Sequence, residues 1–478
     1  MFNIIRFSKI FTVIFLNLHT INRFGHHELT NEKLFIRQLD AGKNEIKNIQ
    51  QPVDHFDAKE TRTWNMTYIQ NLEFWKPNGP IYISIGGASS YKTQLNIFKK
   101  GFFLYDLAKE TNGALFGTEH RYYGKNTPLS NTNTENLKYL NSRQALADVA
   151  KLIKHVKSKL KAENSKVVVA GGSTLGNAGN LAAWMRLFYT DIVDAAVSAS
   201  GPVLAKADFK DFFEIVGENY LKYGTSGCYD KITKMFIRFQ TLLSTPEGTK
   251  QLKKEEEICD FVNMSMKENQ QVFFEFYLDK YILSAYVAPD VTYFEDECEK
   301  NFNDTNLESD LFLSKPDYVV RDEQGWCYNF DFFQLFNRKF KDCWLYQQCT
   351  EFGAFPSTEA GKHPFTNSLP VEYYYKACKL QFGPEFGKNR VEDGIKATNE
   401  MYGGLHPNVT KVVFVNGEFD PWRRLGVTEN LSDDAPAFVI AKSGRAELLI
   451  HPYMDVDSDE LKDARKKVKS LVKKWIGL

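Results

Sequence analysis

The sequence offers little that would indicate a nucleic-acid partner, a membrane span or a metal centre. Lysine plus arginine equals aspartate plus glutamate, at 60 residues each, and a net charge of zero does not favour a polyanionic partner. No apolar run is long enough to cross a bilayer. The cysteines include no Cys-x-x-Cys pair and show no zinc-type spacing. We therefore expect no nucleic acid, no metal and no cofactor.

Cysteine is also absent from the first 227 residues, and all seven cysteines lie between Cys228 and Cys378. This confinement predicts that one segment is stapled by disulfides in an oxidising compartment, with one thiol left over. Arg6 and Lys9 precede a short apolar run that ends at Leu18, which is typical of a signal peptide over residues 1–20. The alternative is a buried first helix. The chain also has five Asn-x-Ser/Thr triplets that can accept N-glycans, at Asn65, Asn263, Asn303, Asn408 and Asn430.

These features predict a glycoprotein of the secretory pathway, either secreted or lysosomal, that has no membrane association once the signal is removed.

Strand and helix patterns alternate in two parts of the chain. Buried strands are predicted at 80–87, 114–119, 166–170, 195–199, 411–416 and 437–441, and helices at 142–159, 181–188 and 459–476. Residues 207–385 differ, because they are helical, aromatic and contain the cysteines. We predict an α/β fold with a doubly wound, mostly parallel sheet. The sheet domain would be built from residues 21–206 and 386–478, and residues 207–385 would be inserted as a helical cap.

Ser173 and Asp420 stand where an α/β-hydrolase places its nucleophile and its acid. Ser173 follows a valine-rich strand and two glycines, a turn that can expose a hydroxyl, and Asp420 follows a later strand. A histidine is expected after the next strand, which completes the order Ser, Asp, His. The alternative for Ser173 is a structural N-capping serine.

Several longer segments resemble the prolyl carboxypeptidase family of serine exopeptidases. They include TEHRYYGKNTP at 118–128, DCWLYQQCTEFGAF at 342–355 and NGEFDPWRRLGV at 416–427. The resemblance implies an α/β-hydrolase with a helical cap that cleaves bonds near a peptide terminus, often next to proline. It makes Ser173 the nucleophile, Thr174 an oxyanion donor and Asp420 the acid. It places three further residues in or near the substrate pocket, where the alternative is core aromatics and a structural carboxylate: Tyr346, Glu351 and Trp422.

Four departures from the family pattern predict damaged catalytic machinery. Three extra residues separate Ser173 from its helix, so that Gly176 takes the nucleophile position if the helix fixes the register. Arg445 stands at the histidine position, and arginine stays protonated and cannot act as a general base. Ala88 stands where the family usually has a glutamate, and Ala446 stands where many relatives have a cysteine, whose loss would explain the odd cysteine count. We expect an inactive member that can still bind peptides.

Other interpretations remain open. His451, six residues past Arg445, could act as a displaced base with Ser173 and Asp420 in an active serine peptidase. An esterase or lipase on the same fold would need the same missing base. The residues after Ser173 would also fit an imperfect gene model. His120 is interpreted as structural, and a homodimer is compatible with the sequence.

Overall fold

The computed structural model describes residues 43–172, 176–288, 290–303, 318–321, 325–338, 341–359, 361–454 and 457–478. The predicted signal peptide over residues 1–20 lies outside these ranges. Among the described residues, no helix is both long and apolar enough to cross a membrane.

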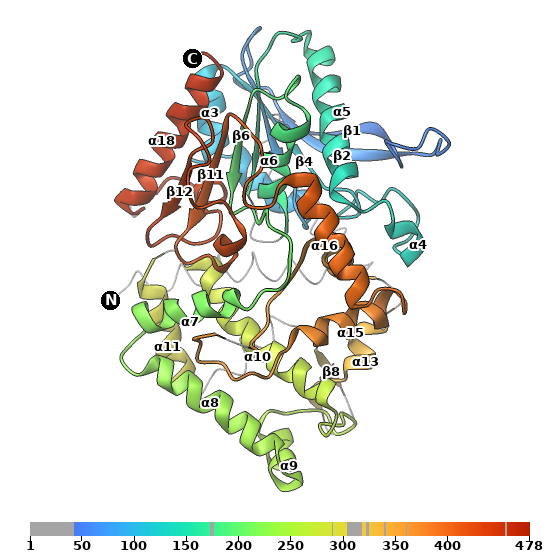
Figure 1. Cartoon of the computed structure of the whole chain (residues 1–478). Helices are drawn as coiled ribbons and strands as arrows, with labels where there is room; N and C mark the ends of the chain where they lie inside the picture. Colours follow the sequence, from blue (N-terminus) through green and yellow to red (C-terminus); the bar gives the residue numbers. More distant parts are fainter. Residues whose placement is uncertain are drawn as a thin grey trace.

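An eight-stranded sheet forms the upper layer of the molecule (Figure 1), in the order β1-β2-β4-β3-β5-β6-β11-β12. The two pairs that involve β2 are antiparallel, and the other five pairs of neighbouring strands are parallel. The central strands are runs of valine, alanine and isoleucine because both faces of the sheet are covered. The strands are β1 (Asn44–Pro52), β2 (Thr63–Asn71), β3 (Ile81–Ile85), β4 (Ala114–Thr118), β5 (Val167–Gly171), β6 (Ala195–Ala199), β11 (Val412–Gly417) and β12 (Ala437–Ile440).

Helices pack on both faces of this sheet. On one face lie α5 (Ser142–Leu160) and α6 (Ala178–Phe188). On the other lie α3 (Phe103–Thr111), α17 (Glu447–Ile450) and α18 (Asp459–Trp475). Each helix turns an apolar stripe toward the strands, which produces two buried core clusters, one on each side. This is the α/β-hydrolase architecture that the sequence predicts.

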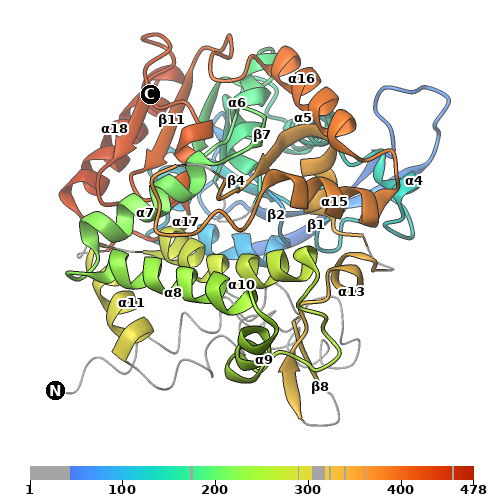
Figure 2. The same cartoon turned by 60° about the horizontal axis from the view of Figure 1, so that its bottom comes forward.

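The segment between β6 and β11 forms a second, mainly helical layer below the sheet (Figures 1 and 2). Its first helix, α7, packs against the turn that follows β11, so this layer covers the carboxyl ends of the strands. Two short strand pairs, β7–β10 and β8–β9, also lie in this segment. The elements are β7 (Lys206–Asp208), α7 (Asp211–Tyr223), α8 (Cys228–Leu243), α9 (Pro246–Glu255), α10 (Lys267–Val287), α11 (Thr292–Asn303), β8 (Val319–Arg321), β9 (Trp326–Tyr328), α13 (Phe332–Phe336), α14 (Cys343–Gln347), η3 (Gln348–Phe352), β10 (Gly353–Phe355), α15 (Val371–Phe382) and α16 (Lys388–Tyr402).

Three disulfides staple this second layer, as the cysteine distribution predicts. They join Cys228 to Cys298, Cys259 to Cys327 and Cys349 to Cys378. The seventh cysteine, Cys343, is free, and burial raises the pKa of its thiol to about 12.

Candidate active site

Asp420 lies in a turn directly after the buried strand β11. It is fully buried and caps the short 3-10 helix η4 (Pro421–Leu425), because its Oδ1 accepts a hydrogen bond from the backbone N–H of Trp422 at 3.0 Å. The last residue of β11, Gly417, must be a glycine. A Cβ atom there would lie 2.1 Å from the carbonyl oxygen of Gly444. The turn after β12 can therefore pack directly on the turn that holds Asp420.

Arg445, in the turn after β12, points its guanidinium at Asp420. Its Nη1 donates to both carboxylate oxygens, at 3.2 and 3.1 Å, and both side chains are almost completely buried, with exposures of 1% and 0%. The guanidinium carbon lies 5.2 Å from the centre of the Trp422 ring. Nη2 donates to the carbonyl oxygen of Gly176 at 3.4 Å. An arginine thus occupies the space next to the buried acid.

The turn that carries Arg445 is held from both sides. The N–H of Ala446, a residue with φ of +52°, donates to Ser200 Oγ at 2.8 Å. The Glu447 carboxylate accepts hydrogen bonds from Ser443 Oγ at 2.7 Å and from the N–H of Gly444 at 3.0 Å. Arg445 is therefore presented to Asp420 by a fixed backbone.

Gly176, just before α6, reaches the same place. Strand β5 and this helix approach closely, since a Cβ on Gly171 would lie 1.8 Å from the carbonyl oxygen of Ala178. Ser173 and Thr174, the predicted nucleophile and oxyanion donor, lie outside the described residues together with Leu175. Gly176, with φ of +88°, is the first described residue after them, and its carbonyl faces Arg445.

Ala88 and Asn177 lie next to Gly176. A Cβ on Gly176 would lie 2.5 Å from the Cβ of Ala88, where the resemblance to the family predicts a glutamate. Asn177 follows Gly176 at the start of α6 and is fully buried, yet among the described residues neither of its side-chain polar atoms has a hydrogen-bond partner. Asn177 was not among the residues predicted for the site. Its position between Ser173 and α6 could have indicated a special role, because an asparagine at the start of a helix ordinarily caps that helix.

His451 is not joined to Asp420 by a hydrogen bond among the described residues. It follows α17, and the charged groups that act on it are Arg465 and Asp457. Its backbone carbonyl accepts a hydrogen bond from Arg465 Nη2 at 3.1 Å, and burial lowers the pKa of its imidazole. The carboxylate of Asp420 is bound instead by Arg445 and by the N–H of Trp422.

Of the three residues predicted to line the substrate pocket, the structure brings only Trp422 to Asp420 and Arg445. Tyr346 packs on the rings of Phe382 and Phe386. These aromatic contacts match the alternative of a core aromatic for Tyr346.

Glu351 lies on η3 and binds the start of α5. Its carboxylate accepts hydrogen bonds from Ser142 Oγ at 2.6 Å and from the Ser142 N–H at 3.0 Å. Complete burial raises the pKa of Glu351 to about 7. A role for this residue in substrate binding stays a prediction, and its contacts match those of a structural carboxylate that joins the two layers.

The motif that contains His120 forms buried bonds of the kind expected for a structural role. Arg121 is buried and donates to both oxygens of Asp148, at 2.7 and 2.9 Å, and His55 bonds the same carboxylate at 2.7 Å. His120 Nδ1 contacts the carbonyl oxygen of Arg121 at 2.8 Å, and burial lowers the pKa of the imidazole to about 4. Within the described ranges no group of three or more histidine, cysteine, aspartate or glutamate side chains could hold a metal ion.

This chain is similar to serine peptidases over most of its length. The family model described as serine carboxypeptidase S28 matches residues 51–309 and 333–468. A Caenorhabditis elegans protein named as a serine protease is 29% identical, over 89% of this chain and 87% of its own. The mouse (Mus musculus) thymus-specific serine protease is 27% identical, over 90% and 87%, and the Pongo abelii lysosomal Pro-X carboxypeptidase is 28% identical, over 89% and 87%.

Among solved structures, a Mycobacterium smegmatis proline iminopeptidase aligns with 90% of this chain and 99% of its own, at 12% identity and a TM-score of 0.37. The family match extends over both parts of the sheet and most of the helical layer between them. The chain therefore belongs to the serine carboxypeptidase S28 family.

Proposed function

We propose that this chain is a member of the serine carboxypeptidase S28 family that binds peptides without hydrolysing them. The observation that carries the proposal is the buried ion pair between Arg445 and Asp420. In a Ser-His-Asp triad the acid orients a histidine, and the histidine takes the proton from the serine. Here the acid is bound by a guanidinium, which stays protonated and has no lone pair that could accept a proton.

The contacts of His120 and His451 support the absence of a replacement base. His120 is buried, and its Nδ1 contacts the carbonyl oxygen of Arg121 in its own motif. His451 is placed among Arg465 and Asp457, and Asp420 would have to release Arg445 before it could orient any imidazole. Releasing Arg445 would leave an unpaired buried charge, which is costly.

We also propose the class of ligand and the cellular route. Relatives at 27–28% identity are named lysosomal Pro-X carboxypeptidase and thymus-specific serine protease. Peptides, including proline-containing ones, are accordingly the ligands to test first. The disulfides and the predicted signal peptide support delivery through the secretory pathway to the lysosome or the exterior, with N-glycans on the exposed triplets.

Fluorophosphonate labelling of the purified, glycosylated protein tests the loss of hydrolysis. The reagent reacts only with an activated serine, so we expect no labelling between about pH 4.5 and 8 from protein shown to be folded by circular dichroism. Ser173→Ala is the control for specific labelling. Labelling that Ser173→Ala abolishes would contradict the proposal and support the active alternative.

In that event His451→Ala, compared with His406→Ala at an exposed histidine, would show whether His451 is the displaced base.

A further inference from the structure

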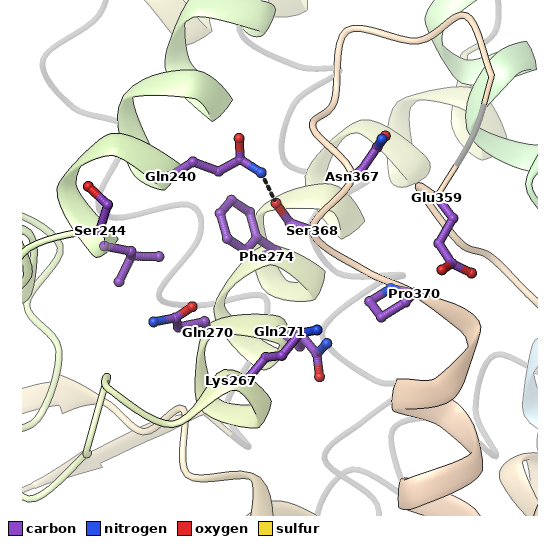
Figure 3. A pocket seen from close by; sticks show the side chains of 11 residues that line it. Gln240, Ser244, Lys267, Gln270, Gln271, Phe274, Glu359, Asn367, Ser368 and Pro370 are labelled. Carbon is purple, nitrogen blue, oxygen red and sulfur yellow. Dashed lines mark hydrogen bonds between the residues drawn. The ribbon is translucent and has the colours of Figure 1, made fainter.

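A polar cavity of about 550 Å³ lies in the helical layer, within the range of small-ligand sites. It is formed by α8, by the first turns of α10 and by the segment that precedes α15. In Figure 3, Gln240 and Ser244 lie on one side, Lys267, Gln270 and Gln271 on another, and Asn367, Ser368 and Pro370 face them. None of the residues assigned to catalysis lines it.

The lining is rich in side-chain amides. Gln240, Gln270, Gln271 and Asn367 each offer donors and an acceptor, and two of them are already fixed in place. Gln240 Nε2 donates to Ser368 Oγ at 2.8 Å, and Gln270 Nε2 donates to the carbonyl oxygen of Met264 at 2.8 Å. This cavity therefore presents a preorganised set of neutral hydrogen-bonding groups.

Gln271 is the member of this set that has a buried acceptor without a hydrogen-bond partner in the described part of the chain. Its side chain is 3% exposed, and its Oε1 has no hydrogen-bond partner among the described residues. A buried acceptor without a partner has lost its hydrogen bonds to water without replacing them, which is unfavourable. A ligand that supplies a donor at this wall of the cavity would remove that cost.

The remaining lining indicates which ligands fit. Lys267 and Glu359 contribute one charge of each sign, so the cavity has no net charge with which to attract a phosphate or a metal ion. Its apolar surface comes from Leu243, Phe274 and Pro370, and Phe274 is itself buried. A neutral ligand with many hydroxyl or amide groups suits this mixture better than an ion or an apolar side chain does.

A predicted N-glycosylation triplet, which would be a covalent source of such a ligand, lies near the cavity, because the carbonyl oxygen of Met264 within it accepts a hydrogen bond from Gln270. Asn263, in the triplet Asn263–Ser265, is exposed and lies one turn before Lys267 at the start of α10. Its carbonyl oxygen accepts hydrogen bonds from the Met266 N–H at 3.2 Å and from Asn269 Nδ2 at 3.0 Å, which ties this turn to the helix. A sugar chain on Asn263 would begin beside the wall that carries Gln270 and Gln271.

We propose that this cavity is a saccharide-binding site for neutral N-acetylated sugars. The ligand is either the N-linked chain on Asn263 of the same molecule or the glycan of another glycoprotein. In both cases amides in the lining would bond the hydroxyl and acetamido groups of the sugar. The site is separate from the Arg445–Asp420 pair, and the proposal does not depend on whether the chain hydrolyses peptides.

Calorimetric titration with N,N′-diacetylchitobiose tests the site. The full-length protein is used after enzymatic deglycosylation, so that the cavity is free of its own sugar. We expect saturable binding that Gln271→Leu weakens about 10- to 100-fold, the range that corresponds to one buried hydrogen bond. Gln240→Ala, at a more exposed lining position, is the second variant and should weaken binding without affecting folding.

Gln381→Leu is the matched control. Gln381 is also buried and also has an unpartnered Oε1, but it lies on α15 and does not line the cavity. Its replacement should leave chitobiose binding unchanged. Absence of binding to the deglycosylated wild type, or equal loss in Gln271→Leu and Gln381→Leu, would overturn the proposal.

A further comparison identifies the source of the sugar. If the occupant is the chain on Asn263, the glycosylated protein should bind chitobiose only after Ser265→Ala removes that glycan. If the ligand comes from another glycoprotein, both forms should bind equally. A proline-containing peptide that binds with the same dependence on Gln271, when chitobiose does not bind, would replace the saccharide with a peptide and refute the proposal.

Discussion

The ion pair between Arg445 and Asp420 makes a strong prediction about stability. Arg445→Met removes the guanidinium but fills similar space, and it leaves the carboxylate of Asp420 buried at 0% exposure with one backbone hydrogen bond. Breaking one partner of a buried pair costs about 3–5 kcal/mol. We expect Arg445→Met to lower the free energy of unfolding by that amount in urea titrations with the disulfides intact.

The double variant Asp420→Leu/Arg445→Met separates the charge from the packing. Replacing both members of a buried pair by apolar groups is often neutral, so the remaining cost should be about 1 kcal/mol for the lost cap of η4. The double variant should therefore be more stable than Arg445→Met alone, a non-additivity that a double-mutant cycle measures directly.

Lys222→Met is the control for this experiment. Lys222 pairs with Glu418 at 2.7 Å, but its side chain is 62% exposed. Exposed pairs contribute about 0–1 kcal/mol. If Arg445→Met costs no more than Lys222→Met, or if the double variant is no more stable than Arg445→Met, the buried-pair reasoning is refuted.

Two further predictions concern Glu351, which links the helical layer to α5, and Gly417, which precedes the turn that holds Asp420. Burial raises the pKa of Glu351 from 4.5 to about 7, so its stabilising contribution is complete below about pH 4.5 and disappears as the pH rises through 7. The shift corresponds to at most about 3 kcal/mol, and Glu351→Gln should flatten the decline in unfolding free energy between about pH 5 and 8. A wild-type profile that rises over this range would contradict the assignment. Gly417→Ala should cost more than about 2 kcal/mol in the same assay, because its Cβ would collide with the Gly444 carbonyl at 2.1 Å. Gly227→Ala is the comparison: a Cβ there would meet nothing within 4 Å, so only the strain of its φ of +78° remains, and it should cost less than Gly417→Ala.

Six strands of the large sheet were predictable from the sequence because they are short apolar runs, whereas the longer and more polar β1 and β2 were not predicted. β5 was expected at 166–170 and spans Val167–Gly171, and β11 was expected at 411–416 and spans Val412–Gly417. Helix α6 begins at Ala178, three residues before the expected start at 181. The reason is tertiary: Gly179 is needed where a Cβ would lie 2.6 Å from the Ala199 carbonyl, so a glycine that suggests a turn belongs to the helix.

Contacts between residues far apart in the chain could not be predicted from the sequence. The seven cysteines indicated stapling but not which of them pair, because spacing alone does not determine connectivity. The contact between Glu351 and Ser142 joins residues 209 positions apart, so the carboxylate was assigned to a substrate pocket on resemblance alone. Arg445 was expected at the histidine position, but its bonds to Asp420 and Gly176 could be found only in three dimensions.

The contacts of Arg445 and Gly176 show that the departures from the family pattern lie together in space. In the sequence, the altered elbow, Ala88 and Arg445 look like separate events. In the structure they touch, because Gly176 packs against Ala88 and its carbonyl accepts a hydrogen bond from Arg445. A glutamate at 88 or a side chain at 176 would occupy the same small space. We therefore expect Arg445→His alone to give no fluorophosphonate labelling. Restoration would also require removal of the three residues that separate Ser173 from its helix, because catalysis tolerates only small displacements of the nucleophile. Labelling of the single Arg445→His variant would show instead that the elbow is intact and that the arginine alone blocks the reaction.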